Sequence, residues 1–283
     1  MQNVAFIINP FSAKKNYKLF LNKLQKKVEH PNFYISESLE GTNDFIKKNF
    51  EKIDIFVAVG GDGTISSVAK HLISTDKILA IFPAGSGNGF SRETNFGKNI
   101  DQLLEKIKTK KFQEVDTITI NEHFCVNVSG AGFDGEVVKN FEKTNRGLFN
   151  YVKVSLQTFF KYKPIEIRFS DEKFQKFDGK YLMLNIANTR QFGNNAYIAP
   201  KADVSDGLAE IVLVKKFPFI HSPTFAFRMF TKKLKAGKYL KYISTGEIEL
   251  SASTENWHID GEFCKIPSPV NIKILPKSLK VLV

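Results

Sequence analysis

The chain has 283 residues, 42% of them hydrophobic and 25% charged, with a formal net charge of +12 and only two cysteines. Its length predicts two domains or one large one around a proper core, and its cysteine usage argues against a disulfide framework or a zinc site. No apolar run approaches the roughly 18 residues of a membrane-spanning helix, and the N-terminus lacks the basic region of a signal peptide, so we expect a cytoplasmic protein.

The first 110 residues alternate apolar runs typical of buried strands with segments of helical periodicity. Beginning with a strand, the predicted strands and helices are, in turn, Val4–Asn9, Lys14–Val28, Asn32–Ser36, Thr42–Phe50, Ile53–Val59, Thr64–Ile73, Ile78–Phe82 and Ile100–Thr109. This alternation predicts a three-layer α/β domain over residues 1–117, with a parallel sheet between helices. Ligands of such sheets bind at the carboxyl ends of the strands.

From about Phe112 the pattern changes to short alternating runs separated by turn residues. The predicted strands are Glu166–Phe169, Lys180–Ala187, Leu208–Val214, Gly246–Ser251, Asn256–Ile259 and Asn271–Leu275. Helical stretches are expected near 147–160 and 223–240. Residues 118–283 are therefore expected to form a second, mostly antiparallel β-sandwich-like domain, and the last strand, about 276–283, is a candidate to return to the first domain.

A glycine-rich turn, Gly60-Gly61-Asp62-Gly63-Thr64, joins the third predicted strand to the third predicted helix. Glycines let the backbone approach a phosphate, and the start of a helix favours an anion. The spacing fits neither the dinucleotide nor the P-loop fingerprint. Asp62 adds a carboxylate, which beside bound phosphates serves mainly a metal ion or a proton. Thr64 would either bind a phosphate or cap the helix.

The first strand ends in a second candidate turn, where Asn9 and Ser12 could form hydrogen bonds with a ligand and Lys14 or Lys15 could meet a phosphate. The alternative is that Ser12 caps the following helix and the lysines are solvated.

The fourth strand ends in a third turn, Gly85-Ser86-Gly87-Asn88, dense enough in glycine for close approach of a ligand. Because the carboxyl ends of parallel strands share one sheet edge, we expect the three turns to form a nucleotide cradle.

This ordered set of motifs resembles the diacylglycerol kinase catalytic-domain family, which includes bacterial lipid kinases and the sphingosine and ceramide kinases. The resemblance covers essentially the whole chain, and its further segments are Gly130–Val137, Ala199–Leu208 and Asp260-Gly261-Glu262. The sequence departs from the family at Ala13, Gly89 and Gly135, where Gly, Asp and Ala are common.

The resemblance implies ATP-dependent phosphorylation of a lipid hydroxyl, with ATP and Mg²⁺ as cofactors. It implies that residues 60–64 and 85–88, with Asn9, Ser12 and Glu262, bind the nucleotide. Asp62 suits Mg²⁺, through water, since this ion keeps several of its waters. Asp134 would support the metal network or the acceptor pocket, or is a plain turn carboxylate. The resemblance over Ala199–Leu208 implies that Asp206 and the main chain of Leu208 hold a structural Mg²⁺. The alternative is that these residues form a solvated β-turn.

Asp260 has two compatible interpretations. Asp260-Gly261 between alternating apolar residues is a strong hairpin signal. The resemblance implies that Asp260 is the general base, which accepts the proton of the lipid hydroxyl, and a turn could project it into a cleft between the domains.

The excess of positive charge indicates an anionic partner: nucleic acid, an acidic membrane surface or nucleotide phosphates. No nucleic-acid-binding motif accompanies it, so we expect no nucleic-acid partner. If 223–240 is one helix, Phe227, Phe230 and Leu234 share one side, and Arg228, Lys232 and Lys235 another. Such a helix suits an anionic lipid surface, although core packing with a solvated face remains the alternative. Residues 151–161 would form a lipid-pocket wall or plain core.

Three functions stay open at this stage. The first is a lipid kinase, cytoplasmic and peripherally bound to a membrane, acting on a diacylglycerol or sphingoid-base lipid, with a homodimer as one option for its assembly. The second is an NAD kinase, which uses the same glycine-rich turn on a soluble substrate. The third is a non-catalytic lipid- or nucleotide-binding protein.

Overall fold

The computed structural model describes residues 3–12, 17–141, 144 and 148–283. The chain divides into two compact units. Unit 1 comprises Met1–Asp116 and Lys277–Val283, and unit 2 comprises Thr117–Pro276.

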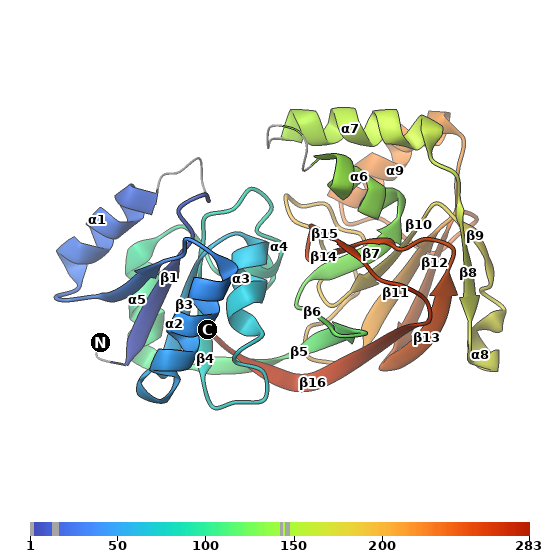
Figure 1. Ribbon diagram of the computed structural model, residues 1–283. Coiled ribbons are helices and arrows are strands. Elements are labelled where there is room, and N and C mark those ends of the chain that lie inside the picture. Colours follow the sequence, from blue (N-terminus) through green and yellow to red (C-terminus); the bar gives the residue numbers. More distant parts are fainter. Residues whose placement is uncertain (1–2, 13–16, 142–143, 145–147) are drawn as a thin grey trace. The chain divides into compact units, whose positions relative to one another are not determined.

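Unit 1 is built on a parallel sheet in the order β2-β1-β3-β4 (Figure 1). Its strands are β1 (Val4–Ile8), β2 (Asn32–Ile35), β3 (Ile55–Gly60) and β4 (Ile78–Pro83). Every residue of β1 and β3 is buried, as expected for strands that are covered on both faces. The end of β16 (Val270–Leu282) adds beside β4, where Lys280 and Val281 pair in parallel with Ile78 and Leu79.

Helices pack on both faces of this sheet. They are α1 (Tyr17–Lys27), α2 (Leu39–Asn49), η2 (Phe50–Lys52), α3 (Asp62–Ala69), α4 (Gly89–Glu93) and α5 (Ile100–Thr109). The Phe20 ring of α1 lies 6.3 Å from Phe6 and 4.5 Å from Phe82. Phe50, after α2, stacks on Phe56. Phe56 pairs with Ala5, the residue before Phe6, so its side chain points to the opposite face of the sheet from that of Phe6.

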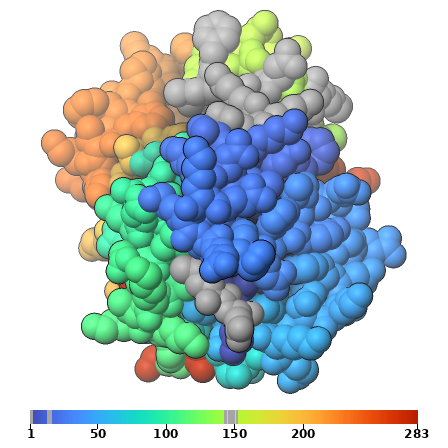
Figure 2. Space-filling model, turned by 90° about the vertical axis from the view of Figure 1, so that its left-hand side faces the viewer, coloured from blue at the N-terminus to red at the C-terminus, as the bar shows by residue number. Residues whose placement is uncertain are grey.

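Three helices of unit 1 share the face that Figure 2 shows. In Figure 2, the darker blue of the α1 region lies between the lighter blue of α2 and the green of α5. These helices leave the carboxyl ends of the strands to the turns that follow β1, β3 and β4. The first fold expectation, a three-layer α/β domain, is confirmed.

Unit 2 contains an antiparallel sheet in the order β12-β11-β10-β7-β14-β15. Its strands are β7 (Val128–Gly132), β10 (Met183–Ala187), β11 (Ala209–Val214), β12 (Leu240–Thr245), β14 (Asn256–Ile259) and β15 (Glu262–Lys265). The first part of β16 joins β13 (Glu247–Ala252), β8 (Ile165–Phe169) and β9 (Gly179–Tyr181) in antiparallel pairing. β5 (Phe112–Ile120) runs from unit 1 into unit 2 and pairs with β6 (His123–Cys125).

The core of unit 2 lies between its two sets of strands. Leu184 and Ile211 of the antiparallel sheet pack in one buried cluster with Leu250 and Ile272 of the other set. Alternate residues of the same strands, such as Met183 and Val212, point to the other face and form a second cluster. The expected β-sandwich-like domain is therefore confirmed.

The second cluster is covered by helices. The helices of unit 2 are α6 (Phe133–Phe141), α7 (Leu148–Lys161), α8 (Glu172–Gln175), η3 (Phe219–His221) and α9 (Ser222–Phe230). Phe159 of α7 and Phe225 of α9 both pack against this face. No helix in the described part of the chain is long and apolar enough to cross a bilayer.

Two element predictions need correction, and α4 (Gly89–Glu93) was not among the predicted elements. The helix expected over 223–240 ends at Phe230, and Leu234 beyond it is buried in the second cluster. The strand expected over 180–187 is split into β9 and β10 at Leu182. The predicted start of the first helix, with Lys14 and Lys15, lies outside the described residues.

Candidate active site

The turns after β1 and β3 are joined by a side-chain hydrogen bond. Asn9 follows β1 and donates from Nδ2 to Thr64 Oγ1 in α3, at 2.9 Å. Its Oδ1 accepts from the backbone N–H of Phe11, and its carbonyl accepts from Ser12 N–H at 3.2 Å. Ser12 itself is buried. Asn9 therefore joins the first turn to the glycine-rich turn, where Thr64 serves as an acceptor, and Ser12 is held to Asn9 within the first turn.

The turns after β3 and β4 touch through their glycines. Gly60 O accepts from Ala84 N–H at 2.7 Å and Gly85 N–H at 3.2 Å. A Cβ built on Gly85 would lie 2.4 Å from Gly61 Cα, far inside any real carbon contact. A Cβ on Gly60 would lie 2.3 Å from Thr64 Oγ1. Close packing of two turns thus requires these glycines, in addition to any approach of a ligand.

Asn88 closes the third turn on itself. Its Oδ1 accepts from Gly85 N–H at 2.9 Å, and its Nδ2 donates to Gly85 O at 2.8 Å. The residue is buried and left-handed, with φ at 53°, a conformation that Asn tolerates better than most residues. Its amide therefore shapes the Gly85–Asn88 turn, while Ser86 at the tip is exposed.

Asp62 binds the start of α4. Its Oδ2 accepts from Gly89 N–H at 3.1 Å and its Oδ1 from Phe90 N–H at 3.2 Å. These amides belong to the first turn of a helix and need an acceptor, which a carboxylate supplies with a favourable charge. A structural duty of Asp62, absent from the sequence expectation, thus accompanies its expected metal role.

The N-terminus of α3 offers an anion site in unit 1. Gly61 occupies the cap position and makes no side-chain cap bond to this helix. Its first turn begins with Asp62, Gly63 and Thr64, whose N–H groups precede the first N–H group that could find an acceptor within the helix. Backbone N–H groups and the helix dipole favour a phosphate at such a point. The residues present therefore fit the phosphates of a nucleotide.

Asp260 lies on the tight turn between β14 and β15. Asp260 and Gly261 have φ values of 49° and 87°, and Ile259 pairs with Glu262 across the hairpin. The hairpin prediction is confirmed. The carboxylate, however, is buried, with 6% of the residue exposed. Its Oδ2 accepts from Val126 N–H at 3.0 Å, and its Oδ1 accepts from Asn127 N–H at 2.8 Å.

A buried thiol completes a ring of hydrogen bonds around Asp260. Cys125 Sγ donates to Asp260 Oδ1 at 3.0 Å, Ser129 Oγ donates to Cys125 Sγ at 2.9 Å, and Asp260 N–H donates to Ser129 Oγ at 3.2 Å. Burial, and then the negative charge of Asp260, raise the pKa of the Cys125 thiol well above its ordinary value. The sulfur therefore keeps its proton and acts as a donor. The ring fixes the orientation of the carboxylate.

Asp134, at the start of α6, forms a second buried network. Asn185 Nδ2 and His258 Nε2 both contact Asp134 Oδ2, the latter at 3.1 Å. Gly261 N–H donates to His258 Nδ1 at 3.3 Å, so Nδ1 is the acceptor and Nε2 carries the proton. This chain links Asp134 to the turn that carries Asp260. His258 and Asn185 were not among the predicted site residues, because only the folded sheet brings them together.

The remaining predicted residues lie at the surface of unit 2. Asp206 Oδ1 accepts from Leu208 N–H at 2.9 Å, and both residues are exposed, as is Glu262. Among the described residues, His, Cys, Asp and Glu side chains form no group of three that could hold a metal ion. The metal roles of Asp62, Asp134, Asp206 and Leu208 stay predictions.

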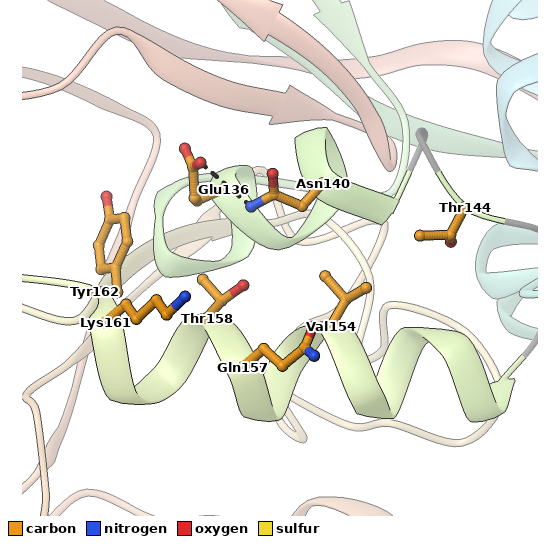
Figure 3. A pocket seen from close by; sticks show the side chains of 8 residues that line it. All are labelled: Glu136, Asn140, Thr144, Val154, Gln157, Thr158, Lys161 and Tyr162. Atoms are coloured by element: carbon orange, nitrogen blue, oxygen red, sulfur yellow. Dashed lines mark hydrogen bonds between the residues drawn. The ribbon is translucent and has the colours of Figure 1, made fainter.

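A cavity of about 470 Å³ lies between α6 and α7 (Figure 3). Its walls carry Glu136 and Asn140 from α6, and Gln157 and Thr158 from α7. Burial, followed by the charges of Asp134 and Glu136, raises the pKa of Tyr162 in its wall to about 12, so this phenol stays protonated. The volume is that of a small-molecule pocket, and most of the polar side chains are donors or acceptors without charge.

Comparisons with known proteins match both halves of the chain. The diacylglycerol kinase catalytic domain matches residues 3–120, and the YegS C-terminal NAD kinase beta sandwich-like domain matches residues 127–283. Diacylglycerol kinases of Mycobacterium tuberculosis and Bacillus subtilis are 29% and 23% identical to it, over 81% and 93% of this chain and 76% and 90% of theirs. A probable YegS-like lipid kinase of Xanthomonas euvesicatoria is 30% identical, over 56% of this chain and 55% of its own.

Solved structures agree on the fold. The crystal structure of a putative diacylglycerol kinase from Bacillus anthracis has a TM-score of 0.78 at 20% identity, covering 99% of this chain and 95% of that one. The match to the C-terminal domain model alone spans more than half of the chain. The chain therefore belongs to the family of diacylglycerol kinases and YegS-like lipid kinases.

Proposed function

We propose that the chain transfers the γ-phosphoryl group of ATP to the hydroxyl group of a lipid of the diacylglycerol or sphingoid-base type. Unit 1 would bind the nucleotide and unit 2 the lipid. The observation that carries this proposal is the set of three interlocked turns around the glycine-rich start of α3, in a chain of the lipid kinase family.

The turns supply what phosphoryl transfer asks of a protein, which is mostly positioning and charge stabilisation. The amides at the start of α3 would bind phosphate oxygens, with Ser12, Ser86 and Gly87 close to the same sheet edge. Asn9, Gly85 and Asn88 would act indirectly, because their side chain or backbone holds one turn against another. These contacts would keep the three turns at a fixed spacing around the phosphates.

Asp62 would hold Mg²⁺ through water, while its two oxygens keep their bonds to α4. Mg²⁺ keeps several of its waters, so the ion would meet this carboxylate through its hydration shell. Mg²⁺ would offset the charge that develops on the phosphoryl oxygens.

Asp260 would accept the proton of the attacking lipid hydroxyl. An alcohol is a poor nucleophile, and a positioned carboxylate typically contributes about 10²–10⁴-fold as a general base. The donors from Cys125, Val126 and Asn127 support this role because they fix the carboxylate before substrate binds. Asp134 is the next candidate. The cavity between α6 and α7 would take the polar head of the lipid.

The experiment is transfer of labelled phosphate from ATP to a panel of diacylglycerol, sphingoid base, ceramide and NAD. Product on one of the lipids supports the proposal, and phosphorylation of NAD alone would make the chain an NAD kinase. Binding of ATP with no transfer to any acceptor would indicate a non-catalytic protein.

The role of Asp260 is tested by Asp260→Asn in the same assay. We expect turnover to fall by about 10²–10⁴-fold with unchanged affinity for ATP. Asp178→Asn is the matched control, since Asp178 also accepts a backbone N–H in unit 2, from Phe169 at 2.9 Å. Retained turnover in Asp260→Asn would leave this residue a structural one and direct attention to Asp134.

A further inference from the structure

Three neighbouring elements of unit 2 expose large apolar side chains. The exposed side chains are those of Val152, Leu156 and Phe160 in α7, Phe219 and Ile220 in η3, and Phe227 and Phe230 in α9. Phe160, Ile220 and Phe227 are 63%, 80% and 62% exposed, which is far from a core environment. In α7 these residues recur every four positions, so they form one stripe along the helix. Its inward positions, Val154 and Phe159, are buried.

Ring contacts join the three elements into one surface. Phe160 and Phe219 lie 4.6 Å apart between their ring centroids, and buried Phe159 lies 5.8 Å from Phe219. Phe217 links α7 to α9, at 5.5 Å from Phe159 and 5.2 Å from Phe225. The exposed side chains are therefore anchored to the buried face of the antiparallel sheet. α7 is the outermost helix of this end of unit 2 (Figure 1).

The segments that carry these side chains have charged residues of one sign. Residues 211–246 contain seven lysines and Arg228 but no Asp or Glu, and residues 148–164 contain three lysines and no acid. Arg228, Lys233 and Lys235 are exposed. Lys216 donates to Tyr162 O, which places its ammonium group beside the end of α7. The apolar stripe thus lies within a basic border.

We propose that the basic aromatic surface, formed by α7, η3, α9 and the segment to Lys241, is where the protein docks on an anionic lipid bilayer. Its apolar side chains would enter the boundary between head groups and acyl chains, while the lysines meet lipid phosphates. A bilayer fits better than a protein partner, because protein interfaces are depleted in lysine. The proposal rests on the proposed function, which brings the protein to a membrane lipid.

The surface differs from the single amphipathic helix expected from the sequence. α9 stops at Phe230, and Leu234, expected on the apolar side, is buried in unit 2. Lys233 and Lys235 therefore belong to a loop beside α9. The docking surface is a composite of two helices, a short 3-10 turn and a basic loop, so α7 is as much a part of it as α9.

The test is sedimentation with vesicles of equal parts phosphatidylcholine and phosphatidylglycerol, compared with pure phosphatidylcholine, without ATP. We expect binding only to the anionic vesicles. Each basic residue near such a surface contributes about fivefold, so the triple variant Arg228→Gln, Lys233→Gln, Lys235→Gln should bind about 100-fold more weakly. Ile220→Ser with Phe227→Ser should lose roughly tenfold or more.

Two controls match these changes. Leu39→Ser removes an equally exposed apolar side chain from unit 1, at 64% exposure. A triple change of the exposed Lys180, Lys265 and Lys273 to Gln removes the same charge elsewhere on unit 2. Both controls should bind vesicles within about twofold of the parent chain, given that exposed charges distant from the bilayer are screened.

Equal loss in the test and control triples would overturn the proposal, because general charge would then explain the binding. Unchanged vesicle binding by the test variants, at an unchanged melting temperature, would also overturn the proposal. If the protein forms a dimer in the absence of vesicles, and the Ile220 and Phe227 changes dissociate this dimer, the surface binds a second copy of this chain instead. Vesicle binding with no kinase activity on any lipid would instead refute the proposed function and leave the surface standing.

Discussion

Gly85→Ala tests whether the turns after β3 and β4 really pack glycine against glycine. The new Cβ would lie 2.4 Å from Gly61 Cα and 2.9 Å from Asn88 Oδ1, where ordinary contact begins at 3.4 Å. The two turns must then separate by about 1 Å, the difference between 3.4 and 2.4 Å. Because the obstacle is backbone, no side chain can swing away to make room.

The expected cost has two parts. Overpacking costs about 1–3 kcal/mol, and the bonds from Ala84 and Gly85 to Gly60 O would lengthen, at roughly 0.5–1.5 kcal/mol for one that breaks. We therefore expect a loss of about 2–4 kcal/mol in the free energy of unfolding. A 1 Å displacement of a catalytic turn can cost about 10²-fold in rate, so ATP turnover should fall by that order.

Urea unfolding and phosphate transfer from labelled ATP measure the two effects. Gly97→Ala is the control in the same unit, because its Cβ would meet only the flexible end of Gln102 at 3.8 Å. It should change stability by less than about 1 kcal/mol. If Gly85→Ala unfolds like Gly97→Ala and keeps its turnover, the interlocked turns do not exist as described.

Three further predictions address single groups. Asp62→Asn should abolish turnover and also lower the free energy of unfolding by about 0.5–2 kcal/mol, because the amide nitrogen of Asn would face an N–H group of α4. Loss of turnover with unchanged stability would instead indicate that Asp62 has only the metal role. Neither cysteine should be alkylated in the native protein at pH 7.5, because burial raises the pKa of both thiols, that of Cys264 to about 11. Mass spectrometry measures the labelling, and rapid labelling of Cys125 would contradict its place in the ring of hydrogen bonds around Asp260. Burial, then Lys70 and Lys47, lower the pKa of His71 below its ordinary 6.5, so the unfolded chain binds the proton more readily. Stability should therefore fall as the pH drops below about 6.5, and His71→Gln should show a smaller fall between pH 7.5 and 5.5 in urea unfolding.

The parallel sheet and its turns were predictable because their signals are local. Runs of buried apolar residues mark β1, β3 and β4, and glycines mark the turns that follow them. The hairpin at Asp260-Gly261 was equally legible, since both residue types tolerate positive φ. In each case the sequence within a few residues carries the whole signal.

Other features depend on contacts between distant residues and left no local signal. α4 has only five residues, and its acceptor, Asp62, lies 27 positions earlier in the chain. Leu234 interrupts the expected long helix because the core of unit 2 buries it. The partners of Asp260 in the β6–β7 turn lie more than 130 positions away, so no periodicity could announce them.

Asp62 and Asp260, which carry the proposed chemistry, are held by the same physical device. Each carboxylate accepts from two consecutive backbone amides, those of Gly89 and Phe90 in one case and Val126 and Asn127 in the other. Two amides at fixed spacing set both the position and the plane of a carboxylate, so little rotamer entropy remains to be lost when substrate binds. The same bonds mean that Asp→Asn removes a charge and also mismatches a donor with a donor. The activity of such a variant therefore reports on the chemistry only when the loss of unfolding free energy caused by the broken hydrogen bond is measured for the same variant.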